Sequence, residues 1–279
     1  MSGYRFCRTD DIPALVDAYN DCWLPHFAPQ APLTVDAFKR EVREIHLWAS
    51  SCMLATEDDR SIGVLLGAKR DDANLVRAIA LRPGHERRGH GRHLLDSLRR
   101  KVAILGPRRL LVEVPAEWGG VRRFFERCGF HAEARYVDFA HAAPRRAPVA
   151  PAALVSAITL EELREAGAFD PPPGLPWERS PQTLVNRSRQ IEGLAVASDV
   201  RIEAYLLHRR VGAGNELLAV GGPRAELLHL LLAGLYERTS GPITFPKVSE
   251  RETAHAALRD LGFESVREHV GYAAELSES

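Results

Sequence analysis

The chain has 279 residues, and its 37 Lys and Arg balance 37 Asp and Glu, which gives a formal net charge of zero. This neutrality argues against a protein that binds nucleic acid through bulk positive charge. The length exceeds the usual single domain of about 100–150 residues, so we expect two domains. Hydrophobic residues make up 45% and charged residues 27%, which is typical of globular proteins.

The sequence predicts no membrane span and no metal site. No apolar run approaches the roughly 20 residues of a membrane helix, and the polar start MSGYRFCRTDD is unlike a secretory signal peptide. The four cysteines, Cys7, Cys22, Cys52 and Cys128, lack C-x-x-C spacing and favour buried reduced thiols over disulfides or a zinc site. We therefore expect a cytoplasmic protein that uses no metal.

The first half predicts an α/β domain of the α+β type. Short turn-forming segments, DDR and DDA, join three strand-like runs, so an antiparallel meander is expected. Helix starts are indicated at Asp10–Asp11, where Pro13 follows in the first turn, and at Thr34. The expected order is a strand (YRFCR), two helices, three strands (CMLATE, SIGVLLGAKR, NLVRAIALRP), a helix, a strand (RRLLVEV), a helix (GGVRRFFERCG) and a strand (HAEARYVDFA).

The second half repeats this plan. The segment LRDLGFESVREHVGYA (258–273) aligns without a gap with FERCGFHAEARYVDFA (125–140), which indicates a duplicated domain. GLAVAS, RIEAYLLHRRV and NELLAVGG match the meander, AELLHLLLAGLYERT the next helix and GPITFPKV the next strand, whereas FDPPPGLPWERSP fits no element. A Pro- and Ala-rich stretch suggests a linker. The expected domains are 1–142 and 154–279, joined by the linker 143–153.

One segment, LRPGHERRGHGRHLL (81–95), predicts an anion site. A strand ends there at Pro83 and a helix begins near Gly91, so backbone N–H groups at the helix start are left unobstructed at Gly89 and Gly91. Arginines flank these glycines and offer donors suited to a pyrophosphate. The region 82–127 also holds twelve basic against five acidic residues, although a basic turn without a ligand is the plain alternative.

These residues carry a resemblance to the GNAT superfamily, the GCN5-related N-acetyltransferases. ALRPGHERRGHGRHLL resembles the family's motif A, V-x-P-x-[YH]-[RQ]-x-x-G-x-[GA]-x-x-L-L, except that Glu86 stands where the family has Arg or Gln. FFERCGF (124–130) is similar to the closing pattern F-Y-x-x-x-G-F, and DDIPALVDAYN to the usual first helix. The resemblance covers roughly residues 4–140.

The second half resembles the same fold but lacks the glycine motif. Its segment GGPRAELLHLLL holds no arginine-flanked G-x-G before the helix, and Pro223 lacks the N–H that an anion would need. The resemblance thus implies a tandem protein of two GNAT-like domains, each a mixed, mostly antiparallel sheet flanked by helices. The first would carry the cofactor motif, and the second would be degenerate and shape a substrate cleft or an interface.

The resemblance also implies a cosubstrate and its binding residues. Acetyl-CoA would lie in a V-shaped split between the fourth and fifth strands, and an amine would attack its thioester directly. The backbone of Ile79, Ala80 and Leu81 would pair with the pantetheine arm. The expected pyrophosphate site comprises Arg87, Arg88, Gly89, His90, Gly91 and Arg92.

The chain departs from the family at the usual catalytic positions. The family's tyrosine in the last helix corresponds to Phe125, and its asparagine after the fifth strand to Trp118. Glu113 is the candidate base, acting directly or through water, and Tyr136 the candidate acid, although a solvated or ion-paired glutamate and a packed tyrosine are the alternatives. His85, His90 and His93 form no metal pattern, and lie in solvent or near the cofactor phosphates. The residues expected to line an acceptor pocket are Trp23, His26, Phe27 and Trp48, with core packing as the alternative.

The expected function is therefore an acetyl-CoA-dependent N-acetyltransferase acting on a primary amine of a small molecule. The alternative is a catalytically inactive GNAT-fold module that binds acyl-CoA or another protein. A nucleic-acid binder using the basic surplus is the weakest hypothesis, because no recognised motif supports it. Neither nucleic acid nor membrane is an expected partner, and the protein is expected to be a monomer or homodimer.

Overall fold

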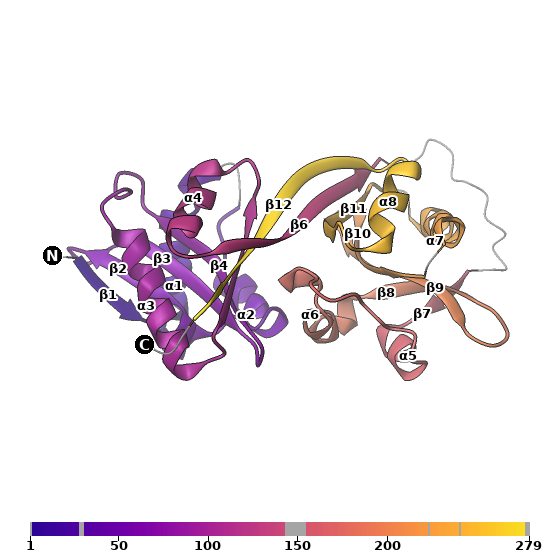
Figure 1. Cartoon of the computed structure of the whole chain (residues 1–279). Helices are drawn as coiled ribbons and strands as arrows, with labels where there is room; N and C mark the ends of the chain where they lie inside the picture. The colour runs from indigo at the N-terminus through magenta and orange to yellow at the C-terminus, as the bar shows by residue number, and fades with distance from the viewer. Residues whose placement is uncertain (1, 28–30, 143–154, 223, 240, 277–279) are drawn as a thin grey trace. The chain divides into compact units, whose positions relative to one another are not determined.

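The computed structural model describes residues 2–27, 31–142, 155–222, 224–239 and 241–276 (Figure 1). Its contacts divide the chain into two compact units. Unit 1 comprises Met1–Val114, Trp118–Glu133 and Gly271–Ser279, and unit 2 comprises Pro115–Glu117 and Ala134–Val270. The expected linker 143–153 lies outside the described residues.

Unit 1 follows the element order expected from the sequence. The buried side chains of its helices lie at helical spacing, for example Leu94, Leu95, Leu98 and Val102 of α3. Its elements are β1 (Ser2–Phe6), α1 (Ile12–Cys22), α2 (Val35–Glu44), β2 (Met53–Glu57), β3 (Arg60–Lys69), β4 (Asn74–Leu81), α3 (His90–Leu105), β5 (Arg109–Pro115) and α4 (Gly119–Arg127).

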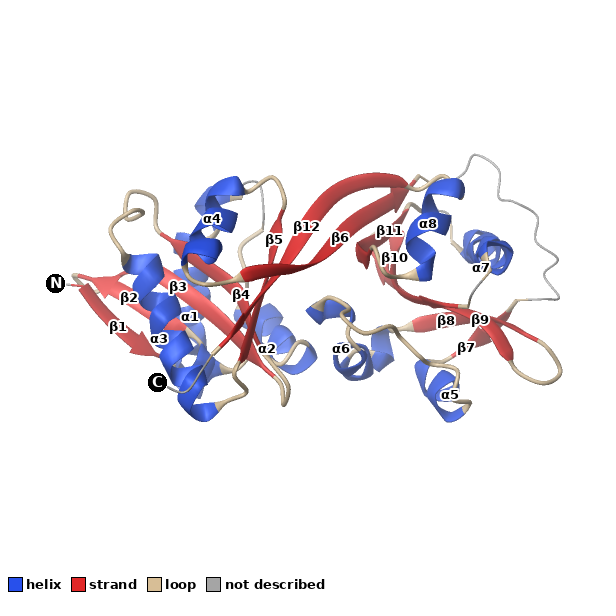
Figure 2. Cartoon of the chain, in the orientation of Figure 1, coloured by secondary structure: helices blue, strands red, loops and turns tan. Residues whose placement is uncertain are grey.

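The sheet of unit 1 is mixed and mostly antiparallel, as expected. Its strands lie in the order β1-β2-β3-β4-β5-β12, where β12 (Glu264–Glu275) contributes its end from Gly271. β1 to β4 pair antiparallel, and β4 pairs parallel with β5. The unbroken buried run from Ile62 to Ala68 in β3 shows that both faces of the sheet are covered, since a half-covered strand would alternate. Helices α1 and α3 both pack on β3 (Figure 2).

The second half repeats the element order of the first, which confirms the duplication. Among the described residues each half contains six strands and four helices in the same order, and β6 (His131–His141) closes the first half as β12 closes the second. The segment that fits no element forms η5 (Trp177–Arg179) and the start of α6. The elements of the second half are β7 (Ser156–Ile158), α5 (Leu160–Glu165), α6 (Pro181–Asn186), β8 (Glu192–Ala197), β9 (Ile202–Val211), β10 (Gly214–Gly221), α7 (Ala225–Arg238), β11 (Ile243–Ser249), α8 (Thr253–Asp260) and β12.

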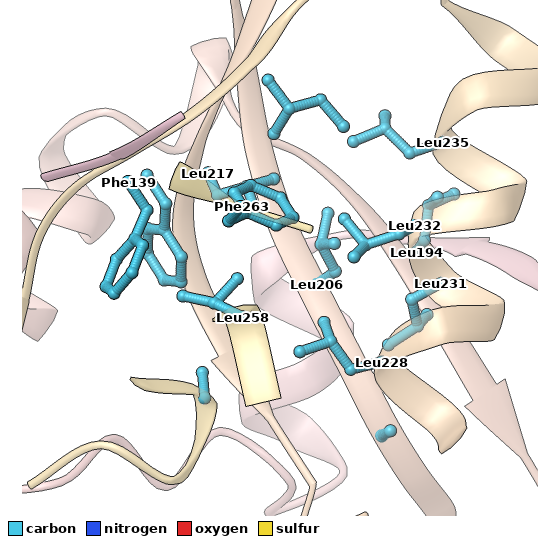
Figure 3. Packing of buried hydrophobic residues seen from close by; sticks show 14 of the residues in the cluster. Phe139, Leu194, Leu206, Leu217, Leu228, Leu231, Leu232, Leu235, Leu258 and Phe263 are labelled. Carbon is cyan, nitrogen blue, oxygen red and sulfur yellow. The ribbon is translucent and has the colours of Figure 1, made fainter. Parts of the chain in front are cut away.

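Unit 2 buries both faces of a sheet ordered β6-β11-β10-β9-β8-β7. Strand alternation divides its apolar residues between two clusters, so Leu206 of β9 lies in one and its neighbour Leu207 in the other. In the larger cluster Leu206 packs with α7 side chains such as Leu231 (Figure 3). The smaller cluster includes Leu160 and Leu163 of α5.

The two units exchange their closing strands, which differs from the linear division expected from the sequence. Residues of β6 from Ala134 onward belong to unit 2, where Phe139 is 1% exposed in the larger cluster. The end of β12 belongs to unit 1, where the buried Tyr272 hydroxyl accepts from Arg122 Nε and donates to Glu126 Oε1, both at 2.9 Å. Each sheet is thus completed by a strand from the opposite half of the sequence.

Candidate active site

The split between β4 and β5 forms the floor of the site. The two parallel strands pair only at Asn74–Leu110 and Leu75–Leu111, near the start of each strand. A bulge follows in β4, because Leu66 faces Ala78 while Gly67 faces Val76, which leaves Arg77 as the extra residue. Beyond this point the strands diverge, and the β4 backbone N–H and C=O groups on that side lose their β5 partners. The split expected between the fourth and fifth strands is therefore present.

A cavity of about 710 Å³ occupies this split and lies within unit 1. Its volume falls within the range of about 300–1,000 Å³ that is usual for small-molecule sites. The lining combines the diverging strand ends with the glycine loop and helix ends: Trp23, His26, Phe27, Val76, Arg77, Ala78, Ile79, Ala80, Leu81, Glu86, Arg87, Gly89, Gly91, Arg92, Val112, Glu113, Val114, Trp118, Gly120, Val121, Phe124 and Phe125.

The glycine loop leaves the first turn of α3 open at the cavity. Gly89 precedes the helix with φ +89°, a conformation that L side chains rarely adopt, and a Cβ there would meet no atom within 4 Å. No side chain caps this helix end, and its first turn holds no acidic residue. The N–H groups of the first turn are therefore available to an anion, which the helix dipole also favours.

The structure brings most of the expected cofactor residues to the cavity. Those that line it are Ile79, Ala80, Leu81, Arg87, Gly89, Gly91 and Arg92, whereas Arg88 and His90 are not among its lining residues. His90 is 8% exposed, and its Nδ1 lies 2.6 Å from the Tyr4 hydroxyl. The Tyr4 ring also lies 3.9 Å from the His93 ring, between centroids. The His90 imidazole is thus buried against Tyr4, whereas His93 contacts the Tyr4 ring but is exposed, as one of the expected alternatives had it.

Glu86, the departure from the family motif, holds the glycine loop in place. Its Oε2 accepts from the Gly84 N–H at 2.8 Å. Hydrogen bonds from its own backbone N–H and from that of Gly84 hold the pKa of this carboxyl below its ordinary value, with smaller contributions from His26 and His85. The carboxylate therefore lies in the cavity wall as a negative charge. The sequence motif signals the departure but not this contact.

The two expected catalytic residues lie in different units. Glu113 lines the cavity from β5, and its charge acts on Arg70, whose pKa burial lowers to about 10. Tyr136 belongs to unit 2, where it is 6% exposed and its hydroxyl donates to the Gly174 carbonyl at 3.3 Å. Among the described residues the cavity lining does not include it. Tyr136 as the acid stays a prediction, and this placement does not support it.

Three of the four expected acceptor-pocket residues line the cavity. His26 Nε2 lies 2.8 Å from the Leu81 carbonyl and must donate to it, because a carbonyl only accepts. The Phe27 ring lies 4.5 Å from Trp23 and 4.8 Å from Trp118, between centroids. Trp48, by contrast, is 54% exposed and is not among the lining residues. Arg77 is absent from the residues expected here, because the bulge that places it depends on strand pairing.

Unit 2 contains the matching split but fills it with its own arginine. β10 and β11 also pair only at Asn215–Ile243 and Glu216–Thr244, and a bulge follows at Leu218. Arg179 is 2% exposed, and its guanidinium donates to the Leu218 carbonyl at 2.9 Å and the Lys247 carbonyl at 2.9 Å. It thus satisfies groups on both diverging strands. The expected effect of Pro223 concerns a residue outside those described.

Two further findings concern the described residues alone. None of the helices they form is both long and apolar enough to cross a membrane. Within the same ranges, no cluster of three or more His, Cys, Asp or Glu side chains is arranged to hold a metal ion.

The chain also resembles known proteins. The sequence profile of the acetyltransferase (GNAT) family matches residues 12–130. Among solved structures, a GCN5-related N-acetyltransferase from Sphaerobacter thermophilus is 16% identical, with a TM-score of 0.68 over 99% of this chain and 96% of that one. A tandem GNAT protein from the clavulanic acid biosynthesis pathway is 17% identical, with a TM-score of 0.67 over 100% of both chains. No curated protein sequence matches this chain.

A third structure, a putative acetyltransferase from Pyrococcus horikoshii, is 14% identical and has a TM-score of 0.64 over 100% of this chain and 91% of that one. At these identities the structural matches establish the fold. The profile match covers the residues that form the cavity, from α1 to α4, and it supports N-acetyltransferase activity in general. The repeated element order, the paired strand splits and these comparisons together identify the chain as a tandem GNAT-fold protein.

Proposed function

We propose that the protein transfers an acetyl group from acetyl-CoA to a primary amine of a small molecule, using the cavity of unit 1. The observation that carries this proposal is the junction of the β4–β5 split with the open start of α3. The split offers β4 strand groups that lack β5 partners to an amide-bearing arm, and the helix start offers N–H donors to a pyrophosphate. Both features border one cavity.

The proposed reaction is a direct transfer. The amine nitrogen attacks the thioester carbonyl carbon, the carbon–sulfur bond breaks, and the CoA sulfur leaves with the bonding pair. The attacking amine must lose a proton, since an alkylamine is mostly present as its ammonium form at neutral pH. Glu113 lines the cavity and is the proposed acceptor of that proton, directly or through water. The products are the N-acetyl amine and CoA.

Binding of acetyl-CoA is the first test. Calorimetric titration should give saturable binding near one ligand per chain. Gly89→Glu should weaken it at least tenfold, which is about 1.4 kcal/mol, because a carboxylate would stand at the anion site in a strained backbone conformation. The matched control is Gly106→Glu at the other end of α3, where φ is also positive and a Cβ would also meet no atom within 4 Å.

Three outcomes separate the candidate functions. Absence of saturable binding to the wild-type chain would overturn the proposal. An equal loss in Gly89→Glu and Gly106→Glu would show that the helix start is not the binding site. Binding without CoA release in the presence of any amine would favour the alternative of an inactive acyl-CoA-binding module, which the family's missing tyrosine at Phe125 also favours.

A further inference from the structure

We propose that the acceptor is an arylalkylamine, a flat aromatic ring that carries a primary amine on a short chain. Its ring would lie against three aromatic side chains of the cavity, and its amino group would lie beside Glu113. This inference rests on the proposed function and names the substrate class of the same site.

An aromatic wall of Trp23, Phe27 and Trp118 borders the cavity. The three residues come from separate elements: Trp23 ends α1, Phe27 follows η2 (Leu24–His26), and Trp118 precedes α4. Phe27 lies in the middle, tilted by 34° against Trp23 and stacked at 27° on Trp118. Centroid separations of 4.5 and 4.8 Å fall within the range in which aromatic rings attract one another beyond their buried area.

The aromatic wall is not ordinary core packing. The core aromatics of the same unit are closed off, since Phe125 is 1% and Phe130 4% exposed. Each member of the wall is only half-buried and faces the cavity. A ring surface left open at a cavity gains most from a flat π-system, because a saturated chain of the same size offers burial but no ring–ring interaction.

The charges of the cavity fit an acceptor that arrives as a cation. Glu86 and Glu113 both line it. Three arginines also line it: Arg87, and Arg77 and Arg92, which lie 3.8 Å from a Glu41 oxygen and 3.8 Å from an Asp96 oxygen respectively, both outside the lining. The carboxylates of Glu41 and Asp96 therefore partly balance the positive charge of Arg77 and Arg92. An ammonium beside a carboxylate and open aromatic rings is attracted by both, since ring faces also favour cations.

The test compares amines that differ in the ring alone. Acetyl-CoA-dependent CoA release is measured for 2-phenylethylamine and tryptamine against 2-cyclohexylethylamine and n-hexylamine. All four carry a primary amine on an alkyl carbon, and kcat/KM is expressed per concentration of free base, because a β-aryl ring lowers the basicity of the amine. The two aromatic amines should show kcat/KM at least about tenfold higher, which corresponds to about 1.4 kcal/mol.

Variants assign this preference to the wall. Trp118→Leu should raise KM for 2-phenylethylamine about tenfold and change that for 2-cyclohexylethylamine less than about threefold, with the Kd of acetyl-CoA unchanged. The control is Trp48→Leu, which removes an indole that is 54% exposed and outside the lining. It should leave both amines unaffected.

Equal kcat/KM for aryl and cyclohexyl amines would overturn the inference while leaving acetyl transfer intact. The inference also fails if Trp118→Leu affects both amines equally. If calorimetry finds no acetyl-CoA binding at all, the proposed function itself fails, and the inference falls with it. The binding measurement thus separates the two failures.

Discussion

Arg179 binds Glu252 through two hydrogen bonds, from Nη1 to Oε1 at 2.9 Å and from Nη2 to Oε2 at 2.6 Å, and both side chains are at least 90% buried. The Arg179 guanidinium also lies 4.3 Å from the centre of the Phe245 ring. This pair lies at the split between β10 and β11 of unit 2, which corresponds to the β4–β5 split that holds the cavity in unit 1. In unit 2 the Arg179 guanidinium thus bonds backbone carbonyls of both diverging strands, Leu218 on β10 and Lys247 on β11.

Arg179→Met should lower the free energy of unfolding by about 3–5 kcal/mol, because it leaves the Glu252 carboxylate buried without its cation. Urea unfolding measures the loss. Arg201→Met is the control, since this arginine forms an exposed pair with Glu203 and its loss should change stability far less. A loss no larger than that of the control would contradict this role of Arg179.

Glu113→Gln should reduce kcat about 100-fold with little change in the Kd of acetyl-CoA, since it removes a proton acceptor and keeps the shape of the side chain. Turnover with a primary amine measures the first quantity and calorimetry the second. Glu117→Gln is the control, because Glu117 pairs with Arg267 at 3.0 Å and does not line the cavity. If the kcat of Glu113→Gln stays within twofold of the wild-type value, another group accepts the proton.

Tyr272→Phe should lower the free energy of unfolding by about 1.5–3 kcal/mol, because the hydroxyl bonds two charged groups of α4. Val266→Ala on the same strand removes a side chain that is 66% exposed, and should change stability by less than about 0.5 kcal/mol. Equal stability of the tyrosine and phenylalanine forms would show that this hydroxyl does not hold β12 in unit 1.

The element order of both halves is predictable from the sequence, but the strand exchange is not. The two closing strands have the same pattern of apolar residues, and the sequence alignment of the two segments matches Phe139 with Tyr272. Either strand therefore offers a suitable buried face to either sheet, so periodicity alone does not decide between them. Because β6 leaves unit 1 after Glu133, Tyr136 is carried into unit 2.

Local sequence motifs predict the part of the candidate site that is formed by backbone groups of adjacent residues. The glycine loop and the start of α3 depend on a few adjacent residues, so Gly89 and its neighbours are recognisable in the sequence. Arg77 and the contact of Glu86 with Gly84 depend on strand register and loop geometry. Trp118 stands out in the sequence only as a departure from the family, since its partner Phe27 lies about 90 residues away.

Asp11→Asn should remove stability in a defined pH range. Hydrogen bonds from Arg5, together with one from the Arg8 N–H, lower the pKa of Asp11 from 3.8 to about 2. A lowered folded-state pKa contributes stability that is complete above 3.8 and is lost as the pH falls through about 2. The difference in unfolding free energy between wild type and Asp11→Asn should thus be constant from pH 7 to pH 5 and shrink below pH 4. The matched control is Asp17→Asn, at an exposed position.

The four cysteine thiols should react slowly with Ellman's reagent in the folded protein. All four are buried, and burial raises the pKa of Cys7 and Cys52 to about 12 and that of Cys22 to about 11. Thiolate, the reactive form, is therefore scarce at pH 8. Four equivalents should appear only after unfolding, and their rapid release from native protein would contradict the buried placement.

The exchanged strands also set an order of events during translation. Unit 1 holds the candidate active site, yet the strand beyond β5 comes from residues 271–275, which a ribosome adds only after all of residues 134–270. The sheet that carries the cavity therefore stays one strand short while the whole of the second repeat is synthesised. A nascent chain stalled between β5 and β12 lacks the native partner of the β5 edge, and an unpaired strand edge is a template for pairing with other chains.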